Sequence, residues 1–340
     1  VIIGFSQIER KEKQIFHYTD VSAEPAGTTA NKINAYLIDT DMVFIENRKK
    51  PLCPAPEMVF GSMPNDGGYF LLSSEEKDNL INTNSAINNF IRPFVGADEF
   101  LYNTRRYCIW LKDVAPSKYS GIKEIKKRIQ SVKEHRERST RENTRKLAAF
   151  PSIFGEIRQP ETDYLLIPRH SSGNRKYIPI GFIDKNTIAG DSNIIIPNAT
   201  LYEFGVITSL MHMVWTKRIA GYLGTSIRYS ASMVYNNFPW PNPADKQKEK
   251  IESAARKVLD ARLKFRDDSL ADLYDPLTMH SELVKAHQKL DKAVDAAYGR
   301  TFANDSERVA YLFELYQKLS GELFRDEKKR GKGKKDRGAR

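Results

Sequence analysis

Cysteine is scarce in this chain of 340 residues, which contains only Cys53 and Cys108. Two isolated thiols without a Cys-x-x-Cys spacing argue against a zinc site and against a framework of disulfide bonds. The sequence also has no apolar run long enough to cross a bilayer and no recognisable signal peptide. These absences favour an intracellular, cytoplasmic protein.

An initiator methionine is also missing, because the chain opens with the segment Val1–Phe5. This apolar segment predicts a β-strand that has no earlier strand to pair with. We therefore expect the chain to be a fragment of a longer protein, in which residues 1–46 close a preceding domain.

Catalytic signatures are absent or incomplete. Amino-methyltransferases use an Asn/Asp-Pro-Pro-aromatic loop and a Gly-rich loop that holds S-adenosylmethionine, and the sequence contains neither. The segment Asn237–Trp240 approaches the first motif, but Phe238 stands where the first proline belongs. Asp113 with Glu124 and Lys126 matches a metal-dependent nuclease signature, although Glu124 falls in a helical pattern. The sequence therefore predicts no catalytic residue in this chain.

Positive charge exceeds negative charge, with 54 Lys and Arg against 43 Asp and Glu and a formal net charge of +11. A basic balance of this size favours a polyanionic partner, most simply nucleic acid. The tail at 326–340 carries much of the excess. Because this tail is rich in Lys, Arg and Gly, it is expected to be disordered.

A second basic cluster lies between residues 120 and 147. Apolar residues recur there at three- and four-residue steps, which predicts a long helix with one thin buried stripe. The stripe consists of Ile122, Ile125, Ile129 and Val132. The other faces are mainly basic, as expected for a helix that follows DNA phosphates. Its candidates for phosphate contacts are Lys126, Lys127 and Arg136.

The remaining patterns predict an α+β protein, with a mixed, β-rich domain followed by a small C-terminal helical bundle. Strands are expected at 164–168, 177–182 and 193–197, and a helix at about 201–220. His212 of this helix is expected in the core. Helices are expected again from Pro243 to about residue 265, at 281–298 and at 306–324.

Polar and basic side chains gather in a turn at 169–176 and in two loops at 184–192 and 224–228. Arginine pairs with guanine, asparagine pairs with adenine, and serine donates or accepts at base edges or phosphates. We interpret the segment from 164 to 241 as a β-rich surface that faces duplex DNA. Its candidates for contacts with the DNA backbone are Arg169, Arg175 and Lys176.

Five motifs, in this order, make nearly the whole chain similar to one family. They are VFGSMPNDGG at 59–68, RYCIWL at 106–111, YIPIGF at 177–182, YSA with VYNNFPWP within 229–241, and LADLYDPLT at 270–278. With these motifs the chain resembles the C-terminal part of the MmeI-like DNA methyltransferases, the type IIL restriction–modification enzymes.

The resemblance implies a DNA target recognition domain at 47–242 and a C-terminal helical domain at 243–325. Residues 1–46 would be the end of the methyltransferase catalytic domain. Full-length relatives transfer a methyl group from S-adenosylmethionine to adenine N6 within a short DNA site, and many also carry an N-terminal nuclease. The implied partners are double-stranded DNA and these N-terminal domains of the same polypeptide. The fragment itself is expected to hold no cofactor.

The family also has positions that read DNA bases. By resemblance these positions correspond to Ser192, Gly224, Ser226 and Arg228. Arg228 is the strongest candidate for a base contact, whereas Gly224 has no side chain with which to read.

Two other interpretations remain open from the sequence. In the first, the fragment is a metal-dependent nuclease that uses Asp113 and Glu124, and cleavage lost on Glu124→Ala would favour it. In the second, the chain is a protein-interaction module whose basic helix binds an acidic partner. Absence of DNA binding at low salt would favour this second interpretation.

Overall fold

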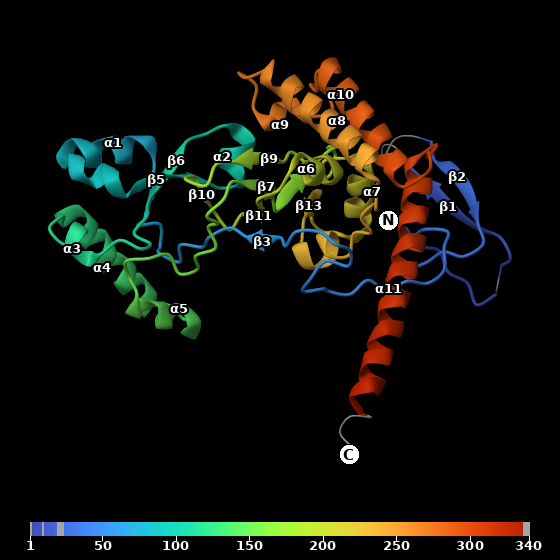
Figure 1. Cartoon of the computed structure of the whole chain (residues 1–340), viewed down its shortest axis with the longest axis horizontal. Helices are drawn as coiled ribbons and strands as arrows, with labels where there is room; N and C mark the ends of the chain where they lie inside the picture. The colour runs from blue at the N-terminus through green and yellow to red at the C-terminus, as the bar shows by residue number, and fades with distance from the viewer. Residues whose placement is uncertain (1, 9, 19–23, 336–340) are drawn as a thin grey trace.

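The N-terminal segment contains one β-hairpin, which lies at the same end of the molecule as helix α11 (Figure 1). The computed structural model describes residues 2–8, 10–18 and 24–335. Strands β1 (Lys13–His17) and β2 (Ala26–Ala30) pair in antiparallel fashion. Residues 2–6 are not in a strand, so the strand predicted at 1–5 is wrong for its described residues. A strand needs a hydrogen-bonded neighbour, and this segment does not pair with one.

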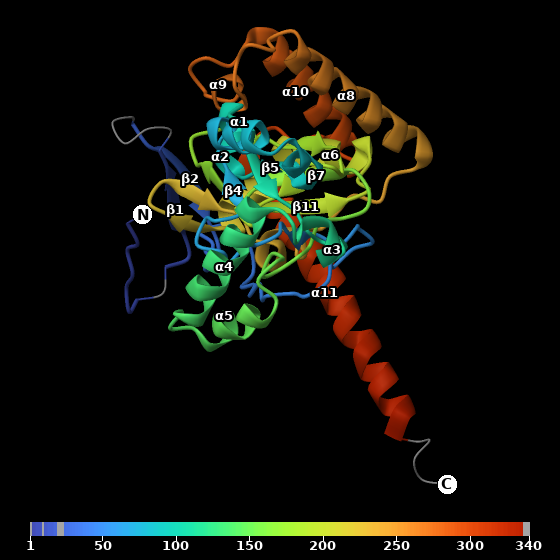
Figure 2. The same ribbon diagram turned by 90° about the vertical axis from the view of Figure 1, so that its left-hand side faces the viewer.

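The first lobe of the molecule lies at the opposite end in Figure 1 and faces the viewer in Figure 2. Its sheet has the order β10-β5-β6-β4. The strands are β4 (Leu71–Leu72), β5 (Ile91–Val95), β6 (Arg106–Ile109) and β10 (Ile188–Ala189). The helices are α1 (Ser74–Thr83), α2 (Ala97–Tyr102), α3 (Pro116–Tyr119), α4 (Lys123–Glu137) and α5 (Glu142–Lys146), with short 3₁₀ turns at Ser85–Phe90 and Leu147–Ala149.

Helix α4 packs against this sheet through part of the predicted apolar stripe. Ile125 and Val132 are fully buried in one core with Phe70 and Leu72 of the sheet region. The helix predicted over residues 120–147 is interrupted between α4 and α5. The buried stripe therefore orients α4 with its basic faces toward solvent. Helix α5 lies beyond the C-terminal end of α4.

The central sheet has the order β3-β11-β7-β9. Its strands are β3 (Val59–Phe60), β7 (Tyr164–Pro168), β9 (Gly181–Ile183) and β11 (Asn193–Pro197). The strands predicted at 164–168 and 193–197 are confirmed. All five residues of β7 are buried, because Leu165 and Ile167 face the large core while Tyr164 and Leu166 face a smaller one. Continuous apolar runs are typical of strands covered on both faces.

Two helices cover the large core beside this sheet. They are α6 (Leu201–Ile207) and α7 (Leu210–Ile219), where the sequence predicts one continuous helix. The break occurs because Ser209 acts as an N-cap, its side chain accepting a hydrogen bond from the backbone N–H of His212.

The C-terminal part is helical, as predicted. It contains α8 (Asp245–Leu263), α9 (Leu270–Leu273), α10 (Ser281–Ala297) and α11 (Asp305–Lys335). Helix α8 packs on α10 and also on α6, through a stripe that includes Ile251, Ala255 and Val258. The sequence predicts disorder for 326–340; residues 326–335 continue α11, while 336–340 lie outside the described residues. The chain has the predicted α+β fold. Within the described ranges, no helix combines the length and apolarity that spanning a bilayer requires.

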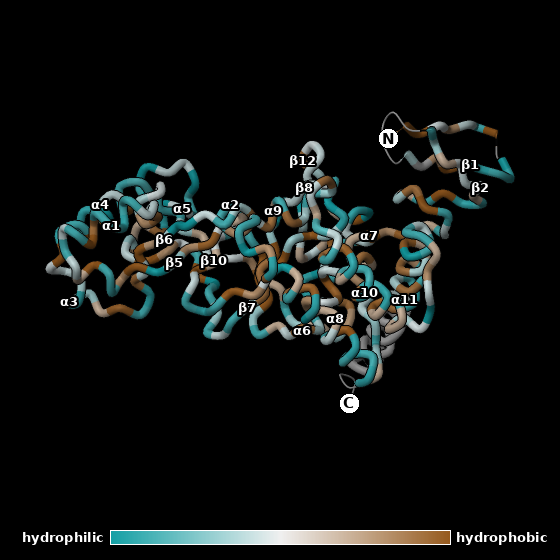
Figure 3. Tube along the Cα trace, turned by 90° about the horizontal axis from the view of Figure 1, so that it is seen from above, coloured by the Kyte–Doolittle hydropathy of each residue, from teal (hydrophilic) through white to brown (hydrophobic). Residues whose placement is uncertain are grey.

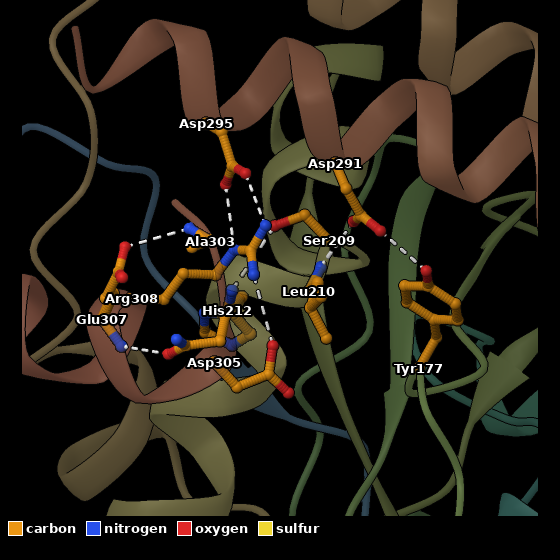
Figure 4. A network of polar contacts seen from close by, with 11 residues as sticks. Tyr177, Ser209, Leu210, His212, Asp291, Asp295, Ala303, Asp305, Glu307 and Arg308 are labelled. Carbon is orange, nitrogen blue, oxygen red and sulfur yellow. Dashed lines mark hydrogen bonds and ion pairs between the residues drawn. The ribbon is translucent and has the colours of Figure 1, made fainter. Parts of the chain in front are cut away.

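Buried polar contacts join the C-terminal helices to the central domain (Figure 4). The Asp291 carboxylate of α10 accepts hydrogen bonds from the Tyr177 hydroxyl at 2.7 Å and from the Leu210 backbone N–H at 2.8 Å. One turn further along α10, Asp295 forms a buried ion pair with Arg308 of α11 at 2.6 Å. Burial raises the pKa of Asp291 to about 6, although both hydrogen bonds act to lower it.

The free energy of unfolding is expected to fall as pH rises toward 6, relative to an Asp291→Asn variant. The folded state binds the Asp291 proton more tightly, so this stabilisation is complete below the ordinary pKa of 3.8 and lost above about 6. The loss should be on the order of 2 kcal/mol. Asparagine preserves the contacts, since its oxygen accepts from Leu210 and its amide donates to the Tyr177 hydroxyl. Urea unfolding of both proteins between about pH 4.5 and pH 7.5 measures the difference, and parallel curves would contradict it.

Candidate nucleic-acid interface

A small third sheet brings together two of the segments that the sequence suggests for DNA contact. Strand β13 (Ser226–Arg228) lies in the middle, between β12 (Gly221–Leu223) and β8 (His170–Ser172), and both pairings are antiparallel. The turn at 169–176 and the loop at 224–228 are therefore neighbours, although they are distant in sequence. Seen from above, β8 and β12 project from one side of the molecule (Figure 3).

Side chains alternate across a strand, so this sheet has an inner and an outer side. The cross-strand pair Ile227 and Ser171 is buried, which sets the inner side against the core. The outer side carries the rows Gly221–Arg228–His170 and Leu223–Ser226–Ser172. We call these six residues the outer face. Arg228, His170 and Leu223 are exposed, while the two serines are half-buried.

Gly224 has a structural role in the hairpin that carries the outer face. Leu223 pairs with Ser226, so β12 and β13 are joined by a loop of only two residues. Of these two, Gly224 has a φ of 60° and Thr225 has no positive φ. Glycine at the first of two loop positions is typical of a type II′ turn, whose twist matches that of the strands. The position contributes the turn geometry rather than a side chain.

The end of β13 is anchored in the core. Tyr229, which follows Arg228, is 2% exposed, and its hydroxyl lies 2.8 Å from Nε2 of His212 on α7. His212 is buried in the core, as predicted, and burial lowers its pKa to about 3, so the ring is neutral. This anchor fixes the backbone from which the Arg228 side chain extends.

Arg169 connects Ser192 to the outer face. The Arg169 backbone N–H donates to the Ser192 carbonyl at 3.0 Å, and the Arg169 carbonyl accepts from the Tyr229 N–H at 2.8 Å. The Ser192 side chain is exposed, and its Oγ accepts a hydrogen bond from the Ala97 N–H at 2.8 Å. Ser192 is therefore linked through the backbone of Arg169 to the end of β13, the strand that carries Ser226 and Arg228.

The charge on this surface comes from arginine rather than histidine. The Arg169 guanidinium donates to the Asp191 carbonyl at 3.0 Å and lies 4.9 Å from the ring centre of Phe60, an exposed aromatic residue of β3. Such stacking and hydrogen bonding hold a guanidinium in one orientation. Partial burial, together with the charges of Arg169 and Arg228, lowers the pKa of His170. Arg169 and Arg228 therefore carry the positive charge here, and the neutral ring of His170 can donate or accept a hydrogen bond beside them.

Helix α4 presents further unneutralised positive charge. Several of its cations have a carboxylate within ion-pair distance, as in the pairs Arg128–Glu76, Lys133–Glu137 and Arg138–Glu134. Lys126 and Lys127 are exposed, and neither forms an ion pair with any residue that the structure describes. Lys176, which follows β8, is also exposed. These three lysines stay candidates for phosphate contacts.

Two of the predicted phosphate contacts need correction, because their side chains are buried. Arg136 is fully buried, and its guanidinium donates five hydrogen bonds to backbone carbonyls of Pro64, Asn65, Leu147, Phe150 and Ile153. Arg175 is only 8% exposed and donates to Ser171 Oγ. Through these hydrogen bonds Arg136 connects the loop before β4 to the segment after α5. All five N–H groups of its guanidinium are used, so none remains to bind a phosphate.

The sequence named His170 and Ser172 only as part of the turn at 169–176, and it did not point to Gly221 or Leu223 of the outer face. The alternation of side chains along β8 and β12 contains the necessary signal. That signal is usable only once the strand pairing is known, because the buried residues Ser171 and Ile227 define which side faces the core.

The residues of the alternative nuclease signature lie in different settings. Asp113 occupies a turn with a φ of 59° after β6 and lies near Lys112, whereas Glu124 lies in the first turn of α4. Among the described residues, no group of three or more His, Cys, Asp or Glu side chains could hold a metal ion. A two-strand arrangement of carboxylates, which such nucleases need, does not form around Asp113 and Glu124.

Comparisons with known proteins agree with one another. The family model of the MmeI target recognition domain matches residues 39–242, and that of the MmeI C-terminal domain matches residues 243–324. DNA methyltransferase A of Bacillus subtilis (strain 168) is 37% identical over 322 residues, which are 94% of this chain and 36% of that protein. A solved structure of the type IIL restriction-modification enzyme MmeI in complex with DNA is 44% identical, with a TM-score of 0.87, covering 92% of this chain and 42% of that one.

The chain thus spans less than half the length of these relatives. Within that span the match is nearly continuous, from the segment before β3 through most of the C-terminal helices. The fold shared with the solved structure and the order of the two matched family models agree with the family that the sequence motifs indicate. The chain belongs to the MmeI family, of which it contains the target recognition domain followed by the C-terminal domain.

Proposed function

We propose that this chain is the DNA recognition module of a site-specific adenine-N6 DNA methyltransferase from a restriction–modification system. It binds duplex DNA and positions it for methyl transfer by a catalytic domain that lies outside the chain. The observation that carries the proposal is the outer face, where Ser226 and Arg228 are joined to Ser192 through the backbone of Arg169. The solved structure of MmeI in complex with DNA supports it.

The shape and chemistry of the outer face suit the major groove of DNA. That groove admits a two-stranded β-ribbon and displays a different donor and acceptor pattern for each base pair. An arginine such as Arg228 can donate two hydrogen bonds to O6 and N7 of guanine, and serines such as Ser192 and Ser226 can donate or accept at base edges. Because β13 is anchored through Tyr229, these side chains would meet the bases in a fixed register.

The chemistry of methyl transfer belongs to the part of the relatives that this chain does not cover. A catalytic domain there would bind S-adenosylmethionine and receive the target adenine after it is flipped out of the duplex. The recognition module would hold the flanking bases during this step. The N-terminal domains of the parent polypeptide are thus its partners, and the cytoplasm, where bacterial DNA lies, is the compartment.

Lys126 and Lys127 are expected to contact DNA phosphates. Replacing both with glutamine should weaken binding to every duplex by a similar factor, because phosphate contacts carry no sequence information. The slope of the logarithm of the binding constant against the logarithm of salt concentration should become shallower by about 1 to 2. Fluorescence anisotropy across a salt series measures this slope. The matched control replaces Lys289 and Lys292, two exposed lysines of α10, and an equal change in the control would contradict the assignment.

Selection of duplexes from a randomised DNA pool tests the proposed function directly. The chain is expected to enrich a short sequence, and the Arg228→Ala variant should lose information at one position of it. Enrichment of no sequence by the unaltered chain would contradict a recognition role. Binding that does not weaken with added salt would argue against a DNA interface of any kind.

A further inference from the structure

Leu223 is an apolar side chain on an otherwise polar and basic surface. It is 71% exposed, although it lies at the end of β12 in the same row as Ser226 and Ser172. The hairpin does not need it for packing, because Ile227 supplies the buried apolar contact and is fully buried. An exposed leucine beside candidate base-reading residues suggests an apolar group on the ligand.

The position of Leu223 is fixed by the contacts around the turn. The Gly173 N–H donates to the Thr225 carbonyl at 3.0 Å, which ties the turn to the end of β8. A Cβ on Gly173 would lie 2.6 Å from that carbonyl oxygen, so only glycine allows this approach. The neighbouring Tyr222 is held by its hydroxyl, which donates to the Lys217 carbonyl at 2.9 Å. These contacts fix the position of the hairpin that carries Leu223.

The chemistry of DNA limits what an apolar side chain can contact there. In the major groove the base edges are hydrogen-bond donors and acceptors, with one apolar group, the C5-methyl of thymine. The same row contributes Ser226, and Arg228 lies in the adjacent row beside Gly221, whose missing side chain leaves open space. A base pair can therefore approach this part of the outer face closely.

We propose that Leu223 is a specificity-determining residue that contacts the C5-methyl of a thymine in the major groove, next to the base that faces Ser226. This inference rests on the proposed function, since it requires the outer face to enter the groove. It adds preference for a thymine at one position of the recognised sequence. Arg228 and the serines would read the neighbouring polar edges.

The experiment removes the methyl group from DNA and the leucine from the protein in a double-mutant cycle. A duplex selected by the unaltered chain is resynthesised with deoxyuridine at one thymine at a time, which deletes only the methyl. At one position the affinity of the chain should fall about three- to fourfold, the value of one buried methyl group. The Leu223→Ala variant should bind the thymine duplex correspondingly more weakly and should show no further loss with deoxyuridine there.

Three further results decide the inference. Leu223→Met, which preserves an apolar side chain, should retain sensitivity to deoxyuridine. Leu277→Ala, which removes a leucine that is 95% exposed between α9 and α10, should behave like the unaltered chain. Insensitivity of the unaltered chain to deoxyuridine at every position, or equal sensitivity in Leu223→Ala, would overturn the inference while leaving DNA recognition intact. Failure to select any duplex would instead overturn the proposed function.

Discussion

Arg228→Ala is expected to weaken binding to the recognised duplex by roughly 5- to 150-fold, or about 1–3 kcal/mol. The loss should be confined to one base pair, because Arg228 is an exposed end residue of β13 whose backbone is fixed by the adjacent Tyr229. Discrimination at that base pair should relax, while affinity for unrelated duplexes should change little. Anisotropy titrations with every substitution of the selected duplex measure both quantities.

Two matched variants sharpen this test. Arg228→Lys preserves the positive charge but loses the paired donors of the guanidinium, so it should keep the affinity for unrelated duplexes and should not restore discrimination at that base pair. Arg256→Ala removes an exposed arginine from α8 in the C-terminal part and should leave both quantities unchanged. If Arg228→Ala weakened all duplexes equally, Arg228 would be a phosphate contact and its role as a base reader would be wrong.

Arg136→Ala is expected to lower the free energy of unfolding by about 3 kcal/mol or more, because a charged hydrogen bond contributes about 1.5–3 kcal/mol and orphaned carbonyls lose solvation. The five carbonyls that Arg136 joins come from two separate stretches of the first lobe. Burial lowers the pKa of its guanidinium. Urea unfolding followed by circular dichroism measures the loss.

The control for Arg136 lies two residues further along. The Arg138 side chain is 81% exposed and pairs with Glu134 at 3.9 Å. Such a surface pair contributes little, so Arg138→Ala should change stability by less than about 1 kcal/mol. A small effect of Arg136→Ala, comparable with that of Arg138→Ala, would show that the carbonyl network contributes little to the lobe.

Arg136 shows how far helical periodicity can be taken. Ile125, Ile129 and Val132 recur at steps of four and three, and the next step of four arrives at Arg136. The pattern therefore placed Arg136 on the buried stripe, while its charge suggested the solvent side. Burial of an arginine is tolerated only when its donors are satisfied, and the carbonyls that satisfy them lie outside α4, in the loop before β4 and in the segment after α5. No local pattern could reveal them.

Local chemistry determined much of the architecture. The apolar runs of β7 and β11, the serine and proline signals around helices, and the stripe of α8 were enough to predict an α+β protein with a helical C-terminal part. The predicted helix at 201–220 forms as two helices, whereas the predicted strand at 1–5 does not form in its described residues. A capping serine divided the first into α6 and α7, and the second has no neighbouring strand to bond with.

The sequence by itself determined the family motifs, the basic balance and the main apolar strands and amphipathic helices, because these depend on residues close together in the chain. Only the tertiary structure decided that β8 pairs with β13, that Arg169 bridges to Ser192, and that Leu223 shares a row with Ser226. Those pairings depend on cross-strand register, and a shift of one residue would turn every outer-face side chain inward. The physical reason is that register is set by buried residues such as Ile227, whose partners are brought together only by folding.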